Sequence, residues 1–343
     1  MKAALLTRPG FIEIKYTHDP VIGPEDLLIK IKRVCICGSD NHIYNEGIIA
    51  KSDVVLPFIL GHECSGEVIE IGKNVTGFKK GDRVTVEPSS FCGKCEFCRS
   101  GRYNMCDSYR FLAAPPDNQG AFCEMISHDY HNCFLLPDNM TYEEGAIVEP
   151  LAIIVQAFEI SNFKVNDDVL IHGAGPIGLL ALMLLRAMGA GKCIITDLND
   201  YKLNIAKRLG ADFTINVLKN NVVSIIDSLT NSSGIPVIFD TVGMSKTLSD
   251  SISTSGKNAT IVVIGISDDK ASFDIVDLIC KMLVLKGTTD FVNCFPKAIR
   301  LIENKKVEVM SVISHYYDFN DLNIAFKNMN TNPQTIKTMI RFD

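Results

Sequence analysis

The stretch VLIHGAGPIGLLALMLLRAMGA, at residues 169–190, decides the fold class of this chain. A short apolar run leads into the closely spaced glycines Gly173, Gly175 and Gly178, and a long apolar segment follows them. This order predicts a buried strand, a tight turn and a helix with an apolar face. A strand that is followed at once by a helix is the repeating unit of a parallel sheet.

Five more apolar runs follow this stretch, and helical segments separate most of them. The runs KCIITD, FTIN, VIFD, TIVVIG and LVLKG occupy residues 192–197, 213–216, 237–240, 260–265 and 283–287. With the first strand they make six, which predicts an α/β fold with a doubly wound parallel sheet.

The glycine spacing predicts that this sheet binds a dinucleotide. Gly173 makes the turn, Gly175 lets the backbone approach the pyrophosphate, and Gly178 allows the helix to pack against the strand. Asp197 ends the second strand, where it can accept hydrogen bonds from ribose hydroxyls. NAD is favoured over NADP, because a 2′-phosphate would meet this carboxylate.

Other contacts to the cofactor follow from the direction of the strands. The helix N-terminus offers backbone N–H groups to the pyrophosphate, and the carboxyl ends of parallel strands face the cofactor. These two rules add the positions Pro176, Ile177, Ile264, Gly265, Ile266, Thr288 and Thr289.

Four cysteines crowd a separate segment, CGKCEFCRSGRYNMC. They are Cys92, Cys95, Cys98 and Cys106, in a lobe that spans residues 88–107. Thiolates at this spacing can surround one tetrahedral ion, and four of them leave no open position, so we expect a structural zinc. An iron–sulfur cluster and an emptied or partly used lobe are the alternatives.

A second set of metal-ligand types lies in glycine-rich sequence. Cys37 belongs to VCICGSDNH, His62 and Glu63 belong to the frame G-H-E-x-x-G, and Glu149 belongs to VEPLA. Thiolate, imidazole and carboxylate ligands, with a water in the remaining position, are typical of catalytic zinc.

In order and spacing these motifs resemble the zinc signature of the medium-chain dehydrogenases/reductases, the zinc alcohol dehydrogenase superfamily, over essentially the whole chain. Residues 111–152, FLAAPPDNQGAFCEMISHDYHNCFLLPDNMTYEEGAIVEPLA, look most like the sorbitol and xylitol (polyol) dehydrogenases. The resemblance implies a doubly wound Rossmann sheet that is inserted into a β-rich GroES-like catalytic domain. It places the catalytic domain at residues 1–154 and 286–343, and the NAD-binding domain at 155–285.

The resemblance also implies roles for single residues. Cys37, His62 and Glu63 would hold a catalytic zinc, while Glu149 would bind the zinc-bound water or enter the ligand shell directly. With the lobe, this makes two zinc ions per chain. Lys202 would flank the adenosine of NAD.

In the oxidation of an alcohol by this family's chemistry, we expect Ser39 to take the proton of the alcohol and His42 to pass it to solvent. A route through Glu149 and water is the alternative. The active site would lie in the cleft between the two domains, and the protein would be a homodimer or homotetramer with edge-to-edge contacts between Rossmann domains.

The residues that clamp a polyol depart from the family pattern. Asp290 stands where the family usually has an arginine. Ile43 stands where the family has a tyrosine, and the neighbouring Tyr44 could take the place of that tyrosine only if its loop shifted. A carboxylate that faced the substrate would repel anions, so we expect interconversion of a neutral polyol and its ketose. A sugar acid, a sugar-alcohol phosphate or L-threonine is the alternative substrate. A zinc-free reductase on this fold and a non-enzymatic NAD-binding protein are the alternative classes.

Composition limits the partners. The 343 residues carry a net charge of −6 with no basic run, so we expect no nucleic acid partner. The longest apolar run, at 177–185, is too short for a bilayer. The N-terminus lacks a secretion signal, so a soluble, cytoplasmic protein is expected.

Seven cysteines outside the metal groups are predicted to be buried packing residues, at positions 35, 64, 123, 133, 193, 280 and 294.

Overall fold

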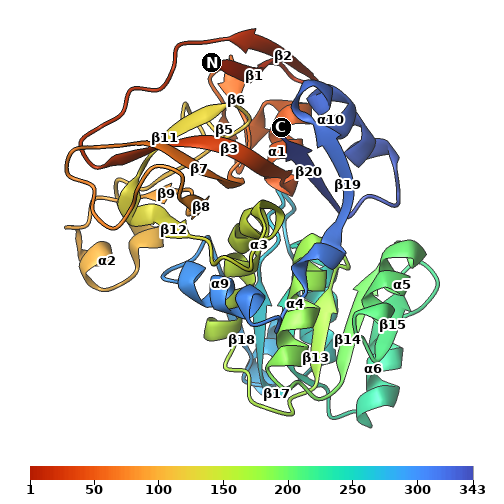
Figure 1. Ribbon diagram of the computed structural model, residues 1–343. Coiled ribbons are helices and arrows are strands. Elements are labelled where there is room, and N and C mark those ends of the chain that lie inside the picture. Colours follow the sequence, from red (N-terminus) through yellow and green to blue (C-terminus); the bar gives the residue numbers. More distant parts are fainter. Residues whose placement is uncertain (343) are drawn as a thin grey trace. The chain divides into compact units, whose positions relative to one another are not determined.

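The computed structural model describes residues 1–342 and divides them into two compact units (Figure 1). Unit 1 comprises Met1–Pro150, Phe295–Lys305 and the residues from Val309 onward, and unit 2 comprises Leu151–Cys294 with Lys306–Glu308. The domain limits expected from the sequence lie at residues 154 and 285, and these units divide after Pro150 and after Cys294. Helix α3 (Tyr142–Ile160) runs across the first division.

Unit 2 contains the predicted doubly wound sheet, with six parallel strands in the order β15-β14-β13-β16-β17-β18. Their bounds are β13 (Val169–His172), β14 (Cys193–Asp197), β15 (Phe213–Asn216), β16 (Ile235–Asp240), β17 (Ser255–Val263) and β18 (Val284–Gly287). The helices between them are α4 (Pro176–Ala187), α5 (Asp200–Arg208), α6 (Val222–Thr230), α7 (Ser245–Thr254) and α8 (Ile275–Cys280). The predicted fold class is confirmed.

Helix α4 shows why the opening stretch folds as it does. It begins at Pro176, whose missing N–H would have no helical partner at this position. Every residue from Gly178 to Leu185 is buried, so the helix is enclosed on all sides rather than amphipathic. It ends where Gly189 takes a left-handed conformation with a φ of 85°.

Unit 1 is rich in β-structure. Its largest sheet has the order β12-β8-β7-β3-β20-β19, and β11 also pairs with β3. The bounds are β3 (Asp26–Ile36), β7 (Glu63–Ile71), β8 (Arg83–Val86), β11 (Met125–Asp129), β12 (Cys133–Leu135), β19 (Ile313–Asp318) and β20 (Lys337–Arg341). Strands from both ends of the chain thus pair in one sheet, with β3 between β7 and β20 (Figure 1).

Smaller elements complete unit 1. A second sheet has the order β2-β1-β6, and β4 and β9 pair with β5 and β10. Their bounds are β1 (Lys2–Arg8), β2 (Phe11–Tyr16), β4 (Ile48–Ile49), β5 (Ser52–Asp53), β6 (Phe58–Ile59), β9 (Ser89–Ser90) and β10 (Arg110–Phe111). The helices are α1 (Gly38–Glu46), α2 (Glu96–Arg99), α9 (Phe295–Glu303) and α10 (Leu322–Thr331), with 3₁₀ turns at Tyr103–Met105, Tyr130–Asn132, Val309–Val312 and Phe319–Asp321.

Each unit has its own apolar core. The core of unit 1 includes Leu6, Ile29 and Phe326, and that of unit 2 includes Leu170 and Ile238, all of them fully buried. A buried side chain of this size contributes about 1.5–3 kcal/mol to folding. Within residues 1–342, no helix has both the length and the apolar character that crossing a bilayer demands.

Candidate metal centre and dinucleotide site

The predicted catalytic ligands lie where two strands of unit 1 meet. Cys37 follows β3 directly and caps helix α1, while His62 precedes β7 and Glu63 begins it. Because β3 and β7 are antiparallel, with Cys35 opposite Glu63, the end of one strand lies beside the start of the other. The potential ligand atoms of Cys37, His62 and Glu63 all lie within 4.8 Å of one another.

The environment of Glu63 indicates whether these residues fit a metal ion. Its side chain is fully buried, and its Oε2 atom has no hydrogen-bond partner within residues 1–342. A buried polar atom without a partner is costly. A zinc ion held by a thiolate, an imidazole and this carboxylate would satisfy the atom, so the residues present fit zinc.

Asp40 orients the imidazole of His62. Its carboxylate accepts the N–H groups of Gly61 and Cys37, at 2.9 and 3.0 Å, and lies 3.6 Å from His62 Nδ1. Burial alone would lower the pKa of His62, but Asp40 raises it well above its usual value. Since Nδ1 faces Asp40, Nε2 is the nitrogen left for an ion.

Glu149 lies close to this group, in helix α3. It is almost fully buried, and its charge adds to the rise in the pKa of Cys35 and Cys64 that burial causes. It is not one of the three residues whose ligand atoms lie within 4.8 Å of one another. The structure therefore places Glu149 near the group without placing it in the inner set.

The predicted proton relay lies on helix α1. Ser39 is half-buried in its first turn, and His42 follows three residues later with its side chain 37% exposed. Residues three apart on a helix lie on the same face. The hydroxyl of Tyr44 is already engaged within the protein, because its ring stacks on Phe326 and the hydroxyl donates to the Gly10 carbonyl at 2.8 Å. Tyr44 therefore does not take the place of the missing tyrosine.

Besides Asp40, two residues that the sequence analysis did not name contact the ligand group. Lys337 Nζ lies 2.6 Å from Glu63 Oε1, and the Phe111 ring centroid lies 5.3 Å from that of His62. Lys337 begins β20, which pairs with β3. The available signal was a lysine among the apolar residues Ile336, Met339 and Ile340.

The cysteine lobe gathers its four thiols as a tetrahedral site requires. All four sulfur atoms lie within 4.8 Å of one another, and those of Cys92 and Cys98 are 4.0 Å apart. Zinc–sulfur bonds of about 2.3 Å in a tetrahedron place sulfur atoms about 3.8 Å apart. Backbone N–H groups of Lys94 and Cys95 lower the pKa of Cys92 to about 6, which favours the thiolate that a metal needs.

Most of the other cysteines are buried, as predicted. Cys35, Cys64, Cys123, Cys133, Cys193 and Cys294 have little or no exposed surface. Cys280 is exposed at the end of α8, so the prediction was wrong for this residue.

The glycine turn of unit 2 suits a dinucleotide. Gly173 has a φ of 94°, and a Cβ atom on Gly178 would lie 1.8 Å from the Gly173 carbonyl oxygen, so neither position tolerates a side chain. A Cβ atom on Gly175 would meet nothing within 4 Å. The space over Gly175 is therefore open to a pyrophosphate, and the residues fit the cofactor.

Asp197 anchors this turn. Its Oδ2 accepts the N–H of Ala174 and its Oδ1 accepts that of Asn199, both at 2.8 Å. Each oxygen keeps a second lone pair for a ribose hydroxyl. The other predicted cofactor positions lie at the start of α4, in α5, and just after β17 and β18, and they are Pro176, Ile177, Lys202, Ile264, Gly265, Ile266, Thr288 and Thr289.

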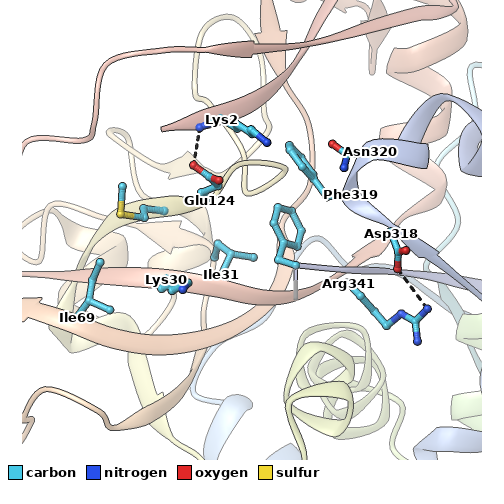
Figure 2. Close-up of a pocket in the computed structure, with 11 residues that line it drawn as sticks. Lys2, Lys30, Ile31, Ile69, Glu124, Asp318, Phe319, Asn320 and Arg341 are labelled. Atoms are coloured by element: carbon cyan, nitrogen blue, oxygen red, sulfur yellow. Dashed lines mark hydrogen bonds and ion pairs between the residues drawn. The ribbon is translucent and has the colours of Figure 1, made fainter.

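Unit 1 also contains a cavity of about 910 Å³ that is separate from these sites, and Figure 2 shows the residues that line it. Two of its carboxylates have partners: Glu124 accepts the backbone N–H of Lys2, and Asp318 lies 3.2 Å from Arg341. None of the predicted site residues lines it. The cavity therefore does not account for the predicted chemistry.

A dinucleotide turn on a doubly wound sheet, combined with two groups of zinc-type ligands, defines the class of zinc-dependent dehydrogenases. Two family models match the chain: an alcohol dehydrogenase GroES-like domain at residues 23–138 and a zinc-binding dehydrogenase at residues 176–304. The chain belongs to the zinc-dependent medium-chain dehydrogenase family, as the resemblance implied.

Individual relatives resemble the chain along most of its length. A sorbitol dehydrogenase of Bacillus subtilis is 35% identical over 92% of this chain and 90% of the relative. An L-idonate 5-dehydrogenase of Vitis vinifera is also 35% identical, over 93% of this chain and 89% of the relative. The crystal structure of an Escherichia coli oxidoreductase/dehydrogenase of unknown specificity has a TM-score of 0.95 and 31% identity, and covers 100% of this chain and 99% of its own.

Proposed function

We propose that the protein interconverts a secondary alcohol of a neutral polyol and the corresponding ketose, with NAD as the hydride carrier. The observation that carries this proposal is the group of Cys37, His62 and Glu63, whose ligand atoms lie within 4.8 Å of one another. The resemblance to a sorbitol dehydrogenase supports the substrate class. The carboxylate of Asp197 beside the glycine turn supports NAD over NADP.

In this proposal, separate residues of the chain hold the metal and move the proton. When bound, zinc and NAD supply a Lewis acid and a hydride acceptor. Cys37, His62 and Glu63 hold the metal, and Asp40 keeps the His62 ring in place. Ser39 takes the proton of the alcohol and His42, which is partly exposed, releases it to solvent. We infer that Glu149 acts through a water molecule, since it lies outside the inner set.

A sugar acid is the second candidate substrate, because an L-idonate 5-dehydrogenase is as similar to the chain as the sorbitol dehydrogenase is. Asp290 bears on this choice. Its backbone has a φ of 49°, a left-handed conformation that asparagine and aspartate tolerate better than most residues. A carboxylate facing the substrate would repel an anion and accept hydrogen bonds from a neutral polyol.

Asp290→Asn is expected to change substrate preference without straining this backbone. We expect kcat/KM for a sugar acid to rise about fivefold relative to a neutral polyol, since removing one like charge is worth on the order of 1 kcal/mol. The measurement is the initial rate of NAD and NADP reduction with sorbitol, xylitol, L-idonate, a sugar-alcohol phosphate and L-threonine.

The exposed carboxylate Asp268 gives the control, and Asp268→Asn should leave the ratio unchanged. If the wild-type protein oxidises L-idonate faster than sorbitol and xylitol, the neutral-polyol proposal is wrong.

The assembly is proposed to be a homodimer or homotetramer through unit 2. Strand β18 ends the strand order, and no other strand within residues 1–342 pairs with its outer side. Exposed apolar side chains precede it in α8 and the following turn, with Val276, Ile279 and Met282 at 58%, 66% and 73% exposure. An unpaired edge with apolar neighbours suits a second copy of the same strand.

Ile279→Lys should therefore weaken self-association by at least about tenfold, because it places a charge in an apolar contact. Light scattering after gel filtration over a range of concentrations measures this. Ile324→Lys is the matched control, since Ile324 is 57% exposed on α10 of unit 1. A wild-type monomer would contradict the proposal.

Twelve free thiols with no disulfide suit a reducing compartment, and we propose that the enzyme works in the cytoplasm. Localisation of a tagged full-length chain tests this.

A further inference from the structure

An ion pair is enclosed in unit 1 beside the ligand group. Lys337 Nζ and Glu63 Oε1 are 2.6 Å apart, and the two side chains are only 3% and 0% exposed. The lysine also donates to the carbonyl of Ile36, at 3.3 Å. Strand pairing explains the contact, because β3 lies between β7, which carries Glu63, and β20, which carries Lys337.

A buried ion pair of this kind contributes little net stability to a fold. Removing two charges from water costs more than their attraction readily returns, and apolar residues of similar size are often as stable. A buried charge pair at a ligand group therefore calls for a functional explanation.

The two carboxylate oxygens of Glu63 have different hydrogen-bond environments. Oε1 accepts the hydrogen bond from Lys337, whereas Oε2 has no partner within residues 1–342. The ammonium thus fixes the carboxylate by one oxygen and leaves the other as its donor atom. Groups that hold a metal ligand in this way commonly set its orientation and its strength as a donor.

We propose that Lys337 is a positioning residue of the catalytic zinc site, which holds Glu63 so that the carboxylate binds the ion through Oε2 alone. The proposal rests on the catalytic zinc site of the proposed function. Lys337 also brings a positive charge to the carboxylate of Glu63 and to the neighbouring sulfur of Cys37, with the carboxylate of Glu149 close to this group. Its charge offsets part of this negative charge and so limits the excess that the ion must balance.

Lys337→Met removes the ammonium and keeps most of the side-chain volume. Partners of metal ligands typically contribute 10–100-fold to metal affinity, so we expect zinc at this site to bind about 10–100-fold more weakly. Competition with a chelator measures this on the full-length chain, and Cys37→Ser identifies which zinc equivalent belongs to the site. The equivalent bound by the four-cysteine lobe should not change. Visible absorption of the Co²⁺-substituted protein should change as well, because it reports coordination.

Lys305→Met is the matched control. Lys305 pairs with Glu144 at 2.7 Å, but its side chain is 58% exposed and the pair is not part of either ligand group. We expect wild-type zinc affinity and a wild-type Co²⁺ spectrum. Lys337→Arg keeps a cation, and we expect it to retain more zinc affinity than Lys337→Met. If Lys337→Met fails to fold, Lys337→Arg must still alter the Co²⁺ spectrum, since it changes the hydrogen bond to Glu63, and an unaltered spectrum overturns the proposal.

A double-mutant cycle separates positioning from a purely structural role. If Lys337 acts through Glu63, then Glu63→Gln and the double variant Glu63→Gln/Lys337→Met should bind zinc with similar affinity. If Lys337→Met weakens zinc binding as much in the Glu63→Gln background as in the wild type, the proposal is overturned. Unchanged zinc affinity in Lys337→Met overturns it too. If Cys37→Ser still binds both zinc equivalents, it is the proposed catalytic site that fails.

Discussion

Replacing Cys37 by serine is expected to remove one of the two zinc ions that the ligand groups predict for each chain, and to lower kcat/KM by at least about a thousandfold. Metal-ion catalysis supplies several kcal/mol of transition-state stabilisation, and about 4 kcal/mol corresponds to three orders of magnitude in rate. The serine hydroxyl is a poor zinc ligand beside a thiolate, and only His62 and Glu63 of the inner set would remain. Zinc analysis of the purified protein and the rate of NAD reduction with a polyol measure the two effects.

Cys35→Ser is the matched control, two residues away in the same segment. Cys35 is fully buried inside β3, and burial raises the pKa of its thiol well above the usual value, so it stays a neutral packing residue. This variant should keep both zinc ions and most of the activity. The opposite pattern, with zinc lost from Cys35→Ser and kept by Cys37→Ser, would contradict the choice of ligand.

The sequence was most informative where a pattern is local. Gly173, Gly175 and Gly178 lie within six residues, and two of their demands arise inside the turn itself: the positive φ of Gly173 and the close approach of Gly178 to the Gly173 carbonyl. The strand–turn–helix unit and the carboxylate of Asp197 could therefore be predicted. In the same way, the short spacings between the four lobe cysteines specify a compact group of thiols.

Features that depend on pairing across the chain could not be predicted. Lys337 is 274 residues from Glu63 in sequence, and nothing in the local pattern shows that β20 pairs beside β3. Strand β17 begins at Ser255 rather than at residue 260, because Ser255 pairs with Ile235 across an irregularity in register. The segment that begins at Ser255 is polar, so it gave no strand signal. Cys280 is exposed because α8 buries none of its residues, and the apolar sequence of this short helix did not reveal that it lies uncovered.

Replacing Cys95 by serine is expected to remove the other zinc ion and to destabilise the lobe, with much less effect on the catalytic ligands. The lobe has little core of its own: α2 has four residues and buries none of them, and the stacked rings of Phe91 and Tyr103 are its main apolar contact. Zinc binding in small domains supplies about 10–16 kcal/mol of folding free energy. Without it the segment should open readily.

Limited proteolysis is the most direct measurement of this opening, because cleavage follows the population of open forms. We expect cutting between residues 92 and 106 to accelerate at least about a hundredfold in Cys95→Ser, since losing even a few kcal/mol raises that population by more. Cys280→Ser, which changes an exposed thiol outside both ligand groups, should resemble the wild type. A Cys95→Ser protein that keeps two zinc ions and resists cleavage would show that metal does not hold the lobe. Cys37→Ser should show the converse behaviour, with turnover lost and the lobe intact, because the two ligand groups share no residue.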